Sequence, residues 1–119
     1  MTQEEKELLL KDLCTRLPYD VLVLNKDGDV ESFTWQELKE FGDGYISKPY
    51  LRPMSSMTEE EEKEYINIDN LSYTCPMDYA HFPAFKRIDW LNAHHFDYRG
   101  LIPKGLAIEV TKKNNPYEN

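Results

Sequence analysis

Long apolar runs, known motifs and basic residues are scarce in this chain, and each shortage argues against one class of protein. No apolar run approaches the roughly 20 residues that cross a bilayer, so we expect no membrane span. Neither a glycine-rich phosphate loop nor a Cys-x-x-Cys pair occurs. Basic residues are few as well: 14 Lys and Arg stand against 22 Asp and Glu, a formal charge of −8 that disfavours binding to nucleic acid.

Cysteine is limited to Cys14 and Cys75. The charged residues 1–6 do not form an apolar export signal, so we expect a cytoplasmic protein. Two thiols in a reducing compartment are usually ordinary structural residues, and that is our interpretation here. The sequence alone leaves a single disulfide between them open.

The chain nevertheless has the composition of a folded protein. Hydrophobic residues make up 40% and aromatic residues 13%, led by eight tyrosines, which is too rich in large side chains for a disordered chain. Its 119 residues suit one domain. We predict a single domain over residues 1–111 and a frayed tail over residues 112–119.

The first elements are a helix and a hairpin. Thr2 and Glu5 have the spacing of a capping box, which predicts a helix over residues 3–17 that ends at Pro18. Residues 21–24 and 30–35 flank an Asp-Gly step, the pattern of a β-hairpin.

The middle of the chain is less regular. Residues 36–41 fit either a short helix or a continued strand, and residues 45–47 fit a third strand. Prolines make residues 48–53 extended, and we expect them to cross the sheet. A second capping box, Thr58 with Glu61, predicts an acidic helix over residues 59–65.

The last third contributes a predicted loop at residues 67–79, a helix at 84–94 and a strand at 106–110. Together these elements predict an α+β domain in which a small, mainly antiparallel sheet packs against the N-terminal helix and the helix at 84–94. The expected core is apolar and drawn from all of them: Leu9, Leu13, Leu17, Val21, Val23, Phe33, Trp35, Ile46, Leu51, Phe85, Ile88, Leu91, Leu101 and Ile108.

Ionisable and aromatic residues concentrate in residues 89–107. A hydrolase would take His94 or His95 as general base, Cys75 or a tyrosine as nucleophile or acid, and Arg99 as an anion clamp. No spacing ties these residues together, so we predict no catalytic residue. The three histidines, His81, His94 and His95, lack the spacing of a metal site, so we predict no metal and no cofactor.

Aromatic and cationic residues on irregular segments are typical of contact surfaces. We therefore predict a non-enzymatic binding protein whose partner is another protein or a second copy of the chain. Its expected contact residues are Tyr50, Arg52, Trp90, His94, His95, Tyr98 and Arg99. The same residue types can stack bases and hold phosphates, so sequestration of a small nucleotide-like molecule is an alternative, and a small His-dependent hydrolase is another.

Two segments carry a resemblance to a known group of proteins. Residues 48–61 read KPYLRPMSSMTEEE, and residues 89–102 read DWLNAHHFDYRGLI. They resemble segments of small proteins of gut Bacteroides-type bacteria and of their phages and mobile elements, and the resemblance extends over residues 48–110. It transfers no catalytic residues. It implies an accessory protein with an interaction or host-defence-related role.

Overall fold

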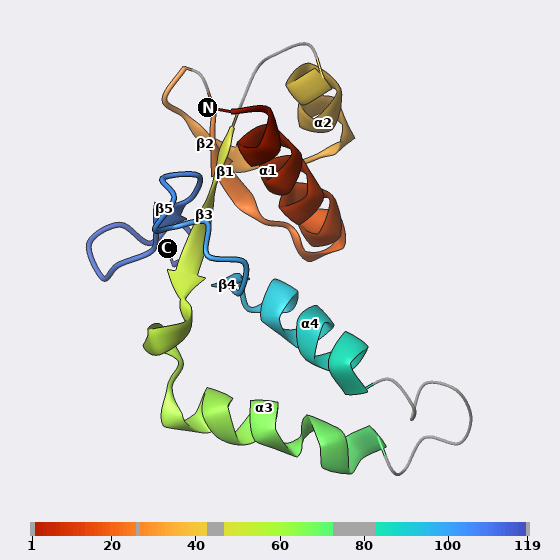
Figure 1. The fold of residues 1–119 in the computed structure, drawn as a ribbon. Helices are drawn as coiled ribbons and strands as arrows, with labels where there is room; N and C mark the ends of the chain where they lie inside the picture. The colour runs from red at the N-terminus through yellow and green to blue at the C-terminus, as the bar shows by residue number, and fades with distance from the viewer. Residues whose placement is uncertain (1, 26, 43–46, 73–82, 119) are drawn as a thin grey trace.

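The computed structural model describes residues 2–25, 27–42, 47–72 and 83–118 of the chain. They form helices and a five-stranded sheet, which confirms the predicted α+β class. In Figure 1, α1 lies beside the hairpin of β1 and β2, while α3 and α4 run side by side at the other end. No helix within these described ranges has both the length and the apolar character needed to cross a membrane.

Helix α1 (Gln3–Arg16) begins at the predicted capping box. The Glu5 amide donates to the Thr2 hydroxyl at 3.1 Å, and the Thr2 amide donates to the Glu5 carboxylate at 2.9 Å. The helix passes into the 3₁₀ turn η1 (Leu17–Tyr19) at Pro18, which has no amide hydrogen to continue the α-helical bonding. Leu9 and Leu13 are fully buried on its inner face.

The predicted hairpin is confirmed: β1 (Leu22–Leu24) pairs antiparallel with β2 (Val30–Ser32). Gly28 in its turn has φ +86°, a conformation that glycine adopts readily. The ambiguous segment that follows is helix α2 (Trp35–Gly42). Trp35 is the first residue of this helix and is 74% exposed, so its predicted place in the core is wrong.

Strand β3 (Lys48–Pro53) is central in the sheet, which confirms that residues 48–53 are extended and cross it. It pairs antiparallel with β1 and parallel with both β4 (Phe96–Asp97) and β5 (Ile108–Glu109). The sheet is therefore mixed rather than mainly antiparallel, because the chain makes a long crossover after β3 and then returns parallel to it at β4 and β5. Of the strand predicted at 45–47, residues 45 and 46 lie outside the described part, and Ser47 precedes β3.

Two prolines are tolerated in this central strand for a geometric reason. The Arg52 amide donates to His95 on the β4 side, whereas the Leu51 carbonyl accepts from Val110 on the β5 side. The backbone groups of successive residues point to opposite edges of a strand. Those of Pro49 and Pro53 therefore point to the β5 side, as those of Leu51 do. Strand β5 pairs with residues 50 and 51, so neither proline occupies a position where β5 requires an amide donor.

The 3₁₀ turn η2 (Met54–Ser56) leads into α3 (Glu59–Ser72), which pairs with α4 (Pro83–Ala93). Helix α3 is longer than predicted, and the expected loop is wrong over residues 67–72. Tyr65 and the buried Ile68, three residues apart, lie on one face of the helix, and the Tyr65 ring packs 5.6 Å from Trp90 of α4. The rest of the predicted loop, with Cys75, lies outside the described residues.

The core gathers where α1 packs on the sheet. Most of the predicted members are buried: Leu9, Leu13, Val21, Val23, Phe33, Leu51, Leu91 and Leu101. Leu17 and Ile108 are half-buried, and Ile88 is 39% exposed and thus wrongly predicted. The side chains of Ile46 and Phe85 lie outside the description.

Residues 111–118 form a segment that we call the C-terminal strap. A frayed tail was expected here, but Tyr117 packs its ring on His95 and hydrogen-bonds to the backbone of β1 and β3. No local pattern predicts this packing, because the hydrogen-bond partners of Tyr117 lie 67 and 95 residues away along the chain.

Candidate functional site

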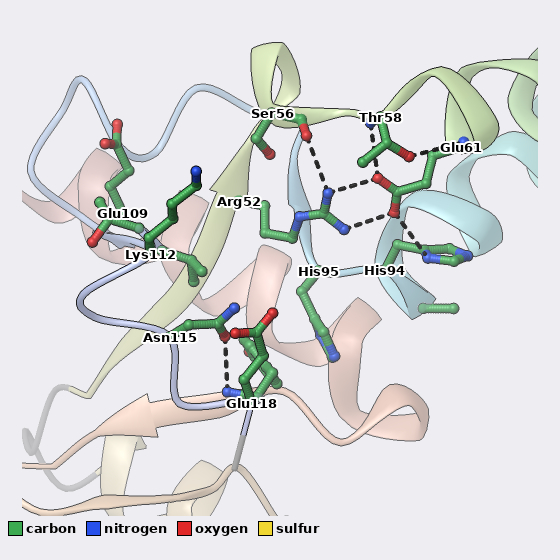
Figure 2. Close-up of a pocket in the computed structure, with 14 residues that line it drawn as sticks. Arg52, Ser56, Thr58, Glu61, His94, His95, Glu109, Lys112, Asn115 and Glu118 are labelled. Carbon is green, nitrogen blue, oxygen red and sulfur yellow. Dashed lines mark hydrogen bonds and ion pairs between the residues drawn. The ribbon is translucent and has the colours of Figure 1, made fainter.

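An open cleft of about 1090 Å³ lies between the C-terminal strap and the ends of several other elements. Arg52 at the end of β3, Glu61 in the first turn of α3 and His94 after α4 line one side. The strap and the adjoining end of β5 supply the other side (Figure 2), with three charged residues: Glu109, Lys112 and Glu118.

The first wall is held by a bidentate ion pair. Arg52 donates to both carboxylate oxygens of Glu61, at 2.7 and 2.8 Å, and to the Ser56 carbonyl at 3.3 Å. The Thr58 amide donates a third hydrogen bond to Glu61, at 3.0 Å, and the Glu61 amide donates to the Thr58 hydroxyl, which is the capping box predicted for α3. The hydrogen bonds from Arg52, more than any other contact, lower the pKa of Glu61 to about 2.

Aromatic rings support this wall from behind. The Arg52 guanidinium lies 4.2 Å from the centre of the Phe96 ring, which stacks on Trp90 at 5.8 Å. The His94 ring lies 4.1 Å from Trp90, and its Nδ1 atom is 3.6 Å from a Glu61 oxygen. The stacked rings and paired charges therefore hold the wall in one arrangement.

His95 sits between the two walls and has an unusual backbone. Its φ of +63° is left-handed, the conformation that ends α4 and that glycine or asparagine usually supplies. Its ring stacks on Tyr117 with centroids 3.9 Å apart and planes 10° apart. Nδ1 is buried and has no hydrogen-bond partner among the described residues. Burial, followed by the charge of Arg16, lowers the pKa of His95 to about 4.

Tyr117 connects the strap to the sheet. Its hydroxyl accepts a hydrogen bond from the Leu22 amide at 3.0 Å and donates one to the Tyr50 carbonyl at 2.8 Å. Burial raises the pKa of Tyr117 above its ordinary value, so the hydroxyl keeps the proton that it donates.

A second polar cluster lies outside the cleft lining. The fully buried Asp12 accepts from Arg16 at 2.7 and 3.2 Å and from Arg99 at 3.2 Å. Tyr98 donates to Asn92 at 2.9 Å, and Arg16 lies over the Tyr98 ring at 5.1 Å. This cluster joins α1 to α4 and β4, and we assign it a role in holding these elements together.

The seven predicted contact residues are thus divided. Arg52, His94 and His95 line the cleft, and Trp90 lies beneath His94. Tyr50 is 6% exposed, so it contributes backbone rather than a contact surface. Tyr98 and Arg99 belong to the second polar cluster, outside the cleft lining.

Sequence reasoning missed Glu61 and Tyr117 as members of the site. The Thr58–Glu61 spacing identified Glu61 only as a helix cap. Nothing local marks Tyr117, because its partners come from three distant segments.

Among the described residues no three His, Cys, Asp or Glu side chains are placed to hold one metal ion. His81 and Cys75, considered above as a metal ligand and as a nucleophile, fall outside the described ranges. The described part of the cleft offers hydrogen-bonding, charged and aromatic surfaces, and two imidazole rings, His94 and His95, are among its lining residues.

Comparison with protein-family models, with curated proteins and with solved structures finds no match to this chain. The functional argument therefore depends on the geometry of the cleft.

Proposed function

We propose that this chain is a non-enzymatic binding protein that holds a segment of a partner protein in the cleft. The observation that carries the proposal is the cleft itself, about 1090 Å³ of open space beside a wall fixed by ion pairs and stacked rings. A wall that is ordered before the partner arrives lowers the entropy cost of binding.

The composition of the lining supports a protein segment rather than a small apolar molecule. Among the 14 lining residues, Ala93 and Val110 are the aliphatic ones, and the rest are polar, charged or aromatic. Small-molecule pockets are lined mostly by apolar side chains, whereas protein interfaces have polar rims and are enriched in tyrosine and arginine.

The charges also favour a protein over a nucleotide. Arg52 already pairs with Glu61, and Glu109 and Glu118 add two exposed carboxylates to the lining. These carboxylates would repel a phosphate group, and the lining has one exposed cation, Lys112, to attract it. Arg99, the other cation on which nucleotide binding was predicted, pairs with Asp12 outside the cleft.

The environment of His95 supports binding over hydrolysis at this residue. The lowered pKa of His95 makes its ring a weak base, and its Nδ1 atom is enclosed. Its ring instead stacks on Tyr117 and supports the strap beside the cleft. The resemblance of residues 48–61 and 89–102 supplies a setting for this proposal: an accessory protein of phages or mobile elements that acts by contact with a cytoplasmic protein.

Site-specific photo-crosslinking tests this proposal. A photoreactive amino acid is placed at Ser56 or Lys112, both exposed in the cleft lining, and at the exposed Lys11 of α1 as the control. In the producing cells, we expect an adduct of one discrete protein mass from both cleft positions and none from Lys11. Adducts that do not differ between the three positions would contradict the proposal.

Native mass spectrometry of the gently purified protein separates the alternatives. A small, discrete mass above the 14.1 kDa monomer would favour the nucleotide-like ligand and count against the proposal. A noncovalent complex with the same total mass as the crosslinked adduct would identify the partner.

A further inference from the structure

Tyr117 occupies a position in the sheet that a backbone hydrogen bond would normally fill. Strands β1 and β3 are in register with Val23 opposite Pro49 and Leu24 opposite Lys48. One more step of this antiparallel register places Leu22 opposite Tyr50. The Leu22 amide and Tyr50 carbonyl are the two groups that the Tyr117 hydroxyl joins.

The direction of the backbone groups supports this interpretation. The Val21 carbonyl accepts from Phe33 on the β2 side. Because backbone groups alternate along a strand, Leu22 faces β3, as its bond to the Tyr117 hydroxyl requires. The hydroxyl therefore completes the ladder as both acceptor and donor at the point where β1 begins.

The ring of Tyr117 fills the space next to this hydroxyl. One face lies on the His95 ring, and the residue also lines the cleft. We call this space the phenol slot; its parts are the Leu22 amide, the Tyr50 carbonyl and the His95 ring. Serine and threonine hydroxyls have no ring to stack there, and phenylalanine has no hydroxyl.

We propose that the phenol slot is a binding site for a tyrosine side chain, filled within this chain by Tyr117 and open to a tyrosine of the partner segment when the strap is displaced. The entry of a partner's tyrosine into the slot rests on the proposed function. The fit of a phenol is already shown by the occupant, which uses both backbone groups and the ring face.

The strap is built so that exchange is feasible. Thr111 and Asn114 hydrogen-bond to each other, and Asn115 bonds to Tyr117 and Glu118, so much of the bonding is internal to the strap. Residues 111–114 are exposed. Residues 111–114 therefore hold the strap in place less than Tyr117 does, and release of the Tyr117 side chain by a competing tyrosine would join the slot to the cleft.

Replacement of the occupant by a small phenol tests the slot directly. The full chain carrying Tyr117→Ala is titrated with p-cresol, the side chain of tyrosine, and with toluene, which lacks the hydroxyl, while thermal unfolding is followed. We expect saturable stabilisation by p-cresol, with an affinity about tenfold higher than that of toluene, since one net hydrogen bond is worth about that factor. The wild-type protein, whose slot is filled, should respond to neither.

Equal responses to p-cresol and toluene, or an equal response of the wild-type protein, would overturn the proposal. If Tyr117→Ala does not fold alone, recovery of the fold by p-cresol supports it. Tyr117→Leu, which keeps an apolar contact with His95, is the second host, and absence of a p-cresol effect in both variants overturns the proposal.

The step to a partner is tested with the peptide acetyl-Asn-Pro-Tyr-Glu-amide and its phenylalanine counterpart. We expect the tyrosine peptide to bind Tyr117→Ala about tenfold more tightly than the phenylalanine peptide. Equal affinities would contradict the exchange. None of these assays contains the cellular partner, so their failure is distinct from a failure of the crosslinking experiment.

Discussion

The hydroxyl group of Tyr117 donates a 2.8 Å hydrogen bond to the backbone carbonyl of Tyr50, in the middle of the central strand. This bond fixes one wall of the cleft to the sheet on which the other wall is built. The position of the strap and the integrity of the sheet are therefore coupled through one side chain.

Removal of this hydroxyl should destabilise the fold. In Tyr117→Phe the Leu22 amide and the Tyr50 carbonyl lose a shared partner, and unmet buried groups cost about 1–3 kcal/mol. Urea denaturation measures the free energy of unfolding. Tyr65→Phe is the control, since it keeps the ring contact with Trp90. Equal losses in the two variants would contradict the role assigned to Tyr117.

The buried ion pair of α1 should be sensitive to loss of one partner. Asp12→Ala leaves Arg16 buried without its carboxylate and removes the partner of Arg99, so we expect a loss of about 3–5 kcal/mol. The exposed neighbour Lys11→Ala should change stability by less than about 0.5 kcal/mol. Denaturation midpoints compare the two, and a loss below about 1 kcal/mol for Asp12→Ala would be inconsistent with this network.

Protonation of His95 should weaken the fold between pH 6.5 and about 4. Its folded pKa is lowered, so the unfolded chain takes up the proton first as the pH falls. The contribution is fully present above pH 6.5 and is lost toward pH 4, on the order of 1–2 kcal/mol because the ring is partly exposed. His95→Asn, which suits the left-handed backbone, should flatten this part of the stability curve. An NMR titration that places the His95 pKa near 6.5 would disprove the assignment.

Glu61 should affect the stability of the fold at a lower pH than His95 does. Its folded pKa of about 2 lies below the ordinary 4.5, so its contribution is present above pH 4.5 and is lost as the pH falls toward 2. The expected size is on the order of 1 kcal/mol for a pair open to solvent on one side. Glu61→Gln should remove this pH dependence, whereas Glu60→Gln, on the exposed face of the same helix, should retain it. Identical curves for both variants would count against the Arg52–Glu61 pair.

Local signals in the sequence predicted local structure well. Both capping boxes and the Asp-Gly hairpin turn were found, because each depends on groups within a few residues of one another. The extension of α3 was missed because Ile68 is buried by packing of α3 on α4, which no local pattern near residue 68 reveals.

The site was predicted in part for the same reason. His95 and Tyr98 are three residues apart, but the left-handed turn at His95 and strand β4 send them to different clusters. Their closeness in the sequence therefore does not place them on one surface. The contribution of Tyr117 depends on register between strands, which was not accessible before the pairing of β1 with β3 was known.

The most direct test of the account is the affinity of the crosslinked partner, once isolated, for a protein whose cleft is blocked. Lys112→Trp places a large ring in the cleft lining, and Lys11→Trp makes the same change on the exposed face of α1. If the cleft holds the partner, Lys112→Trp weakens binding by about tenfold or more, and Lys11→Trp leaves it unchanged. Equal affinity of the two variants would show that the partner binds elsewhere.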